Sequence, residues 1–142
     1  MKPRGILFLC VANSARSQMA EGLARAMLPP GFPLWSAGSR PTRVRPEAIA
    51  VLAELGMDIS RHRSKDVAEI PVSEVGTVIT LCAEEECPLF LGQATRLHWG
   101  LPDPAAHEGS EGERLQAFRE TRDELLRRLE TFFAEEIKAS AP

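Results

Sequence analysis

Two cysteines and an aspartate occur where apolar runs of buried-strand character come to an end. Cys10 ends the run 5–10, Cys82 follows the run 75–81, and Asp103 comes shortly after the run 94–99. Carboxyl ends of parallel strands meet at one edge of a sheet, and ligands bind outside that edge. The sequence therefore predicts that two thiols and a carboxylate converge on one site.

The segment from Cys10 to Arg16 has the composition of an oxyanion-binding loop. It joins a predicted strand to a predicted helix, where backbone N–H groups at the helix start can point at a tetrahedral anion. The guanidinium of Arg16 would bind two of its oxygens. We predict that the anion is held by the loop residues Val11, Ala12, Asn13, Ser14 and Ala15, with Arg16 and Ser17.

Cys10 is the predicted nucleophile of this loop. The helix dipole and Arg16 both favour a thiolate over a neutral thiol, and a thiolate attacks at neutral pH. Asn13 is the single asparagine of the chain. Because asparagine tolerates a left-handed backbone, we expect Asn13 to turn the loop.

Apolar runs alternate with helical patterns along the whole chain. Helical spacing of Met19, Leu23 and Met27 follows the loop, and Pro29-Pro30-Gly31 ends that helix. A second strand is expected over 33–38, and a long terminal helix over about 112–137. The pattern predicts an α/β fold, a doubly wound sheet of four parallel strands with helices on both faces.

A second helix is expected to begin at Pro46 and to stop at Gly56. Its buried face would be formed by Ile49, Leu52 and Leu55, which share one side of a helix. The basic segment 40–45 between the second strand and this helix has no periodicity and is predicted to be a loop.

Length and composition exclude several classes of protein. A chain of 142 residues, 44% hydrophobic and 26% charged, fits one globular domain over 1–142. No apolar run approaches the roughly 18 residues that cross a bilayer, so we expect no membrane association. Three cysteines make no closed disulfide framework, which favours a cytoplasmic protein with functional thiols. We also expect a monomer.

Charge is divided unevenly along the chain. Residues 1–65 hold 10 Lys and Arg against 4 Asp and Glu, and residues 66–142 hold 7 against 16. An acidic protein with a basic amino-terminal part is a poor candidate for nucleic-acid binding and is compatible with a local site for a small anion.

The chain resembles the low-molecular-weight protein tyrosine phosphatase family. Its loop pattern Cys-x-x-Asn-x-x-Arg-Ser/Thr is matched by Cys10, Asn13, Arg16 and Ser17, its second strand by Ser36-Ala37-Gly38, and its acid motif by Asp103-Pro104. The resemblance implies that Cys10 attacks the central atom of the oxyanion. It also implies that Arg16 and the loop amides stabilise the transition state, that Ser17 supports the thiolate, and that Asp103 protonates the leaving oxygen.

Two enzyme activities remain open within that family. Phosphotyrosine phosphatases usually carry paired tyrosines after Asp-Pro, whereas Ala105-Ala106 stand here and the chain has no tyrosine. The segment 98–105 and the cysteines Cys82 and Cys87 are more similar to the arsenate reductases of this fold. Reduction of arsenate to arsenite needs two electrons, which a pair of thiols supplies on becoming a disulfide.

The leading hypothesis is an arsenate reductase coupled to thioredoxin, in which Cys10, then Cys82, then Cys87 relay a disulfide, with phosphatase side activity. The alternative is a phosphatase that hydrolyses phosphate monoesters through a phosphocysteine. A third hypothesis is a phosphocarrier with a transiently phosphorylated cysteine, and Arg16 and Asp103 argue against it.

Two features depart from the reductases. Four residues separate Cys82 from Cys87 where six are usual, which weakens the assignment of Cys87. The reductases also place a carboxylate for a monovalent cation after a Ser-x-x-x-Ser stretch, whereas Lys65 follows Ser60 and Ser64. We expect the ammonium of Lys65 to replace the cation, and we predict no metal and no cofactor.

Overall fold

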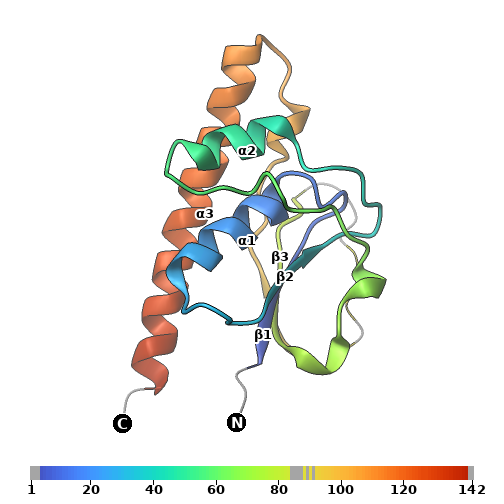
Figure 1. The fold of residues 1–142 in the computed structure, drawn as a ribbon, viewed down its shortest axis with the longest axis vertical. Helices are drawn as coiled ribbons and strands as arrows, with labels where there is room; N and C mark the ends of the chain where they lie inside the picture. Colours follow the sequence, from blue (N-terminus) through green and yellow to red (C-terminus); the bar gives the residue numbers. More distant parts are fainter. Residues whose placement is uncertain (1–3, 84–87, 89, 91, 141–142) are drawn as a thin grey trace.

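A computed structural model describes residues 4–83, 88, 90 and 92–140 of the chain. In these residues four parallel strands form one sheet in the order β2-β1-β3-β4, and Figure 1 labels the first three strands of the chain. The strands are β1 (Gly5–Leu9), β2 (Leu34–Ala37), β3 (Val75–Thr80) and β4 (Thr95–His98). The predicted parallel α/β sheet is confirmed.

Strand β1 lies between two neighbours and is buried along its whole length. It lacks polar alternation because both of its faces are covered. Leu9 is in register with Ala37 of β2 and Thr80 of β3. The residues that follow these three strands, Cys10 among them, therefore start from the same edge of the sheet.

Three α-helices lie on one face of the sheet: α1 (Arg16–Met27), α2 (Pro46–Ala53) and α3 (Glu111–Ser140). Their apolar residues pack with Ile6 and Phe8 of β1 and Ile79 of β3 in one core. Phe118, Leu125 and Leu129 of α3 are fully buried there. None of the helices among the described residues is long and apolar enough to span a membrane.

The opposite face is covered differently. Leu7, Leu9 and Val78 pack there with Ile70 and Phe90. The described helices on this side are two short 3₁₀ helices, η1 (Val67–Glu69) and η2 (Val72–Glu74). Helices thus lie on both faces as expected, with α-helices on one face and 3₁₀ turns on the other.

The buried face of α2 differs from the expectation. The helix begins at Pro46 as predicted but ends at Ala53, and the chain turns through Gly56 at φ +79°. Ala48, Val51 and Leu52 are buried, whereas Leu55 is 41% exposed. Leu55 leaves the apolar face because it belongs to the turn and no longer follows helical spacing.

Candidate active site

The loop between β1 and α1 is held from outside through its carbonyl groups. Three backbone N–H groups of the segment 40–45 donate to it: Arg40 to Val11 O (2.9 Å), Thr42 to Ala12 O (3.2 Å) and Arg45 to Ser14 O (2.9 Å). Within the described residues, no N–H group of 11–15 donates to a backbone carbonyl. Carbonyls turned outward leave these N–H groups available to an anion.

A cavity of about 180 Å³ lies inside the loop. Its lining consists of Cys10, Val11, Ala12, Ser14, Ala15, Arg16 and Asp103. The structure thus brings together the predicted nucleophile, the predicted guanidinium and the predicted acid. Asn13 and Ser17, the other two predicted loop residues, are fully buried and do not line the cavity.

Ser17 supports the sulfur of Cys10. Its Oγ lies 2.8 Å from Cys10 Sγ and accepts a hydrogen bond from Asn13 Nδ2 at 2.7 Å. Because its oxygen already accepts from Asn13, the hydroxyl hydrogen of Ser17 is available to the sulfur. A donor in this position stabilises a thiolate.

Asn13 connects the loop to its surroundings. Its φ of 48° is the positive value expected from the sequence. Its Oδ1 accepts from Gln18 Nε2 (2.9 Å) and from the N–H of Lys65 (2.8 Å). The side chain therefore fixes a turn that few other residues tolerate.

Arg16 lies where the strand ends converge. It is 4% exposed, and its Nη1 donates to Leu101 O (2.9 Å) and more weakly to Leu81 O (3.5 Å). Leu81 follows β3 and Leu101 follows β4, so the guanidinium joins both segments to the loop. Its Nη2 lies 3.9 Å from Asp103 Oδ2.

Asp103 is more open than the loop. Its side chain is 34% exposed, and its Oδ1 accepts from Ala105 N–H (3.0 Å), which caps the 3₁₀ helix η3 (Pro104–Ala106). The carboxyl group contacts both the cavity and solvent. This position suits a group that gives a proton to a leaving oxygen and regains it from water.

Cys82 lies at the same sheet edge. It is buried and disulfide-bonded, whereas Cys10 is a free thiol. The N–H of Leu81 donates to Leu9 O (2.8 Å), so Cys10 and Cys82 leave neighbouring strands close to the point where those strands meet. Cys87 lies outside the described residues.

Comparison with known proteins agrees with this geometry. The profile of the low molecular weight phosphotyrosine protein phosphatases matches residues 5–141. The chain belongs to this family.

Relatives of the chain within the phosphatase family carry the name arsenate reductase. That of Halalkalibacterium halodurans is 39% identical over 134 residues, which are 93% of this chain and 96% of the relative. A solved arsenate reductase in a phosphate-binding state has a TM-score of 0.79 at 32% identity, over 93% and 98% of the two chains. A thioredoxin-dependent arsenate reductase of Corynebacterium glutamicum has a TM-score of 0.60 at 26% identity and covers 91% of this chain and 63% of its own.

In this member of the phosphatase family, Gly38 is required by the packing of the loop. A Cβ there would lie 2.3 Å from Val11 O and 2.8 Å from Cys10 O. Sequence analysis identified Gly38 only as part of a motif. A glycine directly after a strand beside the loop strand was the available signal.

Sequence analysis also missed a partly buried ion pair behind the loop. Glu21 is 8% exposed and accepts from Ser36 Oγ at 2.6 Å. Lys65 Nζ lies 3.9 Å from Glu21 Oε1 and donates to Arg63 O at 2.9 Å. Burial lowers the pKa of Lys65 from its usual value, while Glu21 acts in the opposite direction. The ammonium expected near a cation-binding position thus lies beside a carboxylate.

His62 completes the polar group behind the loop. Its Nδ1 lies 3.0 Å from Gln18 Oε1, and Gln18 in turn donates to Asn13. Burial lowers the pKa of His62 below its usual 6.5, Glu21 raises it, and Lys65 lowers it again. Hydrogen bonds therefore run from His62 through Gln18, Asn13 and Ser17 to the sulfur of Cys10.

Proposed function

We propose that this protein is an arsenate reductase that uses its own thiols to reduce arsenate to arsenite. The observation that carries the proposal is the 38–39% identity to arsenate reductases across more than nine-tenths of both chains. The cavity supports it, because a thiol, a guanidinium and a carboxyl group surround a space that suits a tetrahedral oxyanion.

In the first step the loop binds arsenate through its N–H groups and Arg16. The Cys10 thiolate attacks arsenic, and an As–O bond breaks as Asp103 gives its proton to the departing oxygen. A covalent Cys10–arsenic adduct with arsenic still in the +5 state results. Arg16 and the loop amides stabilise the negative charge that develops on the oxygens.

In the second step the thiolate of Cys82 attacks Cys10 Sγ. The electron pair of the S–As bond passes to arsenic, arsenite leaves, and a Cys10–Cys82 disulfide remains. Cys87 then attacks Cys82 and releases Cys10 as a thiol. Before reduction, this relay therefore leaves Cys10 as a free thiol and Cys82 in a disulfide with Cys87.

A dithiol reductant must return two electrons for each arsenite formed. We propose thioredoxin for this part, because a solved relative is thioredoxin-dependent. We also propose that the enzyme acts as a cytoplasmic monomer, since its thiols need a reducing compartment and each group named above comes from one chain.

Hydrolysis of phosphate monoesters is the second candidate function. It is favoured by the arrangement of Cys10, Arg16 and Asp103, which suffices for a phosphocysteine pathway without Cys82. We propose that it is a side activity of the same loop.

One assay tests both candidate functions. The fully reduced protein is incubated with arsenate without any reductant, and thiols lost are counted against arsenite formed. Two thiols lost per arsenite are expected, and no loss of thiols excludes the reductase. Cys82→Ser is the matched variant: it should hydrolyse p-nitrophenyl phosphate but form no arsenite. Arsenite formation by Cys82→Ser would remove Cys82 from the relay.

A further inference from the structure

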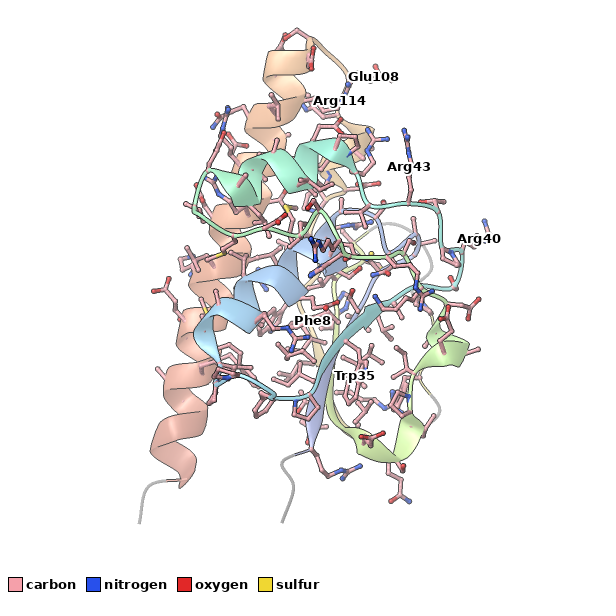
Figure 2. All side chains as sticks on the ribbon, viewed as in Figure 1. Phe8, Trp35, Arg40, Arg43, Glu108 and Arg114 are labelled. Carbon is pink, nitrogen blue, oxygen red and sulfur yellow. The ribbon has the colours of Figure 1, made fainter. Side chains whose placement is uncertain are left out.

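Two arginines next to the oxyanion loop have no part in the steps above. Arg40 and Arg43 belong to the segment whose N–H groups hold the carbonyls of Val11, Ala12 and Ser14. Both residues are exposed, and Figure 2 shows their side chains pointing outward from this segment. Their segment is fixed against the outer side of the oxyanion loop, while their charged groups lie in solvent.

The other cations around the loop are each close to a carboxylate. The pairs are Arg16 with Asp103 (3.9 Å), Arg45 with Glu47 (3.1 Å), Lys65 with Glu21 (3.9 Å) and Arg63 with Glu69 (2.8 Å). Within the described residues, no carboxylate lies within 4.0 Å of the guanidinium of Arg40 or Arg43. Their positive charge is therefore not cancelled locally.

We propose that Arg40 and Arg43 recruit the anionic substrate electrostatically and favour dianions over monoanions and neutral molecules. The proposal deepens the proposed function, on which it rests for the identity of arsenate. It follows from position and charge: positive charge next to the loop that lines the cavity raises the local concentration of anions and the rate at which they enter. An otherwise acidic chain, with formal net charge −3, would repel the same dianion.

The expected size of the effect follows from Coulomb's law with screening. For two charges roughly 10 Å from a dianion in water, removal should lower kcat/KM about eightfold at ~10 mM ionic strength and about twofold at ~0.15 M. A monoanion should lose only about threefold at ~10 mM, and a neutral molecule nothing. At ~1 M salt the difference should vanish for every substrate.

The test variant is Arg40→Gln/Arg43→Gln, which keeps the backbone N–H groups that hold the loop. The matched control is Arg127→Gln/Arg128→Gln, which removes the same charge from the part of α3 beside Thr77 and Thr95, near the amino ends of β3 and β4. Single-turnover arsenite formation without reductant gives kcat/KM for arsenate across ionic strength. A salt-dependent loss in the test variant, with kcat unchanged and the control near wild type, is the expected result.

A second measurement does not depend on arsenate reduction. Iodoacetate and iodoacetamide are similar in size, but only iodoacetate is charged, and both alkylate a thiolate. Alkylation of the peptide that contains Cys10 should slow about threefold at ~10 mM ionic strength for iodoacetate in the test variant and stay constant for iodoacetamide. If this ratio changes while no variant makes arsenite, recruitment stands and the reductase proposal falls.

Four outcomes would overturn the inference. A loss that persists at 1 M salt would mean that the arginines contact the anion directly. An equal loss in the control variant would mean that the effect depends on the net charge of the protein and not on the position of the arginines. A loss confined to turnover with a protein reductant would mean that the arginines bind the partner. Equal slowing of iodoacetate and iodoacetamide would also contradict recruitment, because a neutral reagent does not respond to charge.

Discussion

Residues 10–17 and residues 101–107 contribute to the same cavity, but the surrounding protein holds them to different degrees. Asn13 and Ser17 are fully buried, and the carbonyls of the loop are bound by a separate segment. Asp103 is one-third exposed and is oriented mainly by the turn that it caps. The loop is held in one conformation by the protein around it, whereas the carboxyl group of Asp103 is open to solvent, as its proposed role of proton donor requires.

This difference suggests different consequences for changes in the two regions. A change in the loop should impair every reaction at the site, because binding and attack both depend on it. A change at Asp103 should impair only the reactions whose leaving group needs a proton.

The largest effect is expected for Cys10→Ser. A hydroxyl stays protonated where a thiol ionises, so arsenite formation and ester hydrolysis should both fall below detection. Circular dichroism should show an unchanged fold, because the substitution only replaces a sulfur atom with a smaller oxygen atom. Activity comparable to wild type in either assay would refute the nucleophile.

Asp103→Asn should slow the hydrolysis of some phosphate esters much more than that of others. Hydrolysis of alkyl phosphates, which have poor leaving groups, should fall about 10²-fold, while p-nitrophenyl phosphate should lose much less. Steady-state rates for a series of phosphate esters with different leaving groups measure this difference between substrates. Equal losses across the series would mean that Asp103 acts through Arg16 and is not the proton donor.

Gly38→Ala tests the fixed region without touching a reacting group. The added methyl would lie 2.3 Å from Val11 O, so the loop must move. We expect roughly tenfold weaker phosphate binding, measured as protection of Cys10 from alkylation, in line with about 1–2 kcal/mol of backbone strain. Gly112→Ala is the control, since the nearest atom to its Cβ is 3.9 Å away. Unchanged affinity in Gly38→Ala would show that the loop adapts.

Sequence reasoning succeeded where the determinants are local. The strand before Cys10, the loop to Arg16 and the left-handed turn at Asn13 depend on residues within one short stretch. The partners Glu21 and Lys65 are 44 positions apart and are brought together by the fold. The sequence pattern also could not predict that η1 and η2 cover the second face of the sheet, because single 3₁₀ turns have no periodicity to detect.

The smallest effect concerns the back of the loop, at His62. Because burial holds its pKa below 6.5, the folded protein resists a proton that the unfolded chain accepts as pH falls through 6.5. The unfolded state then binds more protons, so the free energy of unfolding decreases on acidification in this window and levels off below the folded pKa.

His62→Asn should remove this dependence while its amide nitrogen takes the place of Nδ1 and keeps the donation to Gln18. Urea unfolding from pH 8 down to pH 5 should therefore show a shallower loss of stability in the variant than in wild type, with ester hydrolysis at pH 8 within about twofold. His107→Asn, on the exposed turn after η3, controls for the loss of a histidine as such. If the free energy of unfolding of wild type and His62→Asn changed equally with pH, His62 would have the same pKa in the folded and the unfolded chain. The hydrogen bonds behind the oxyanion loop would then be insensitive to acid.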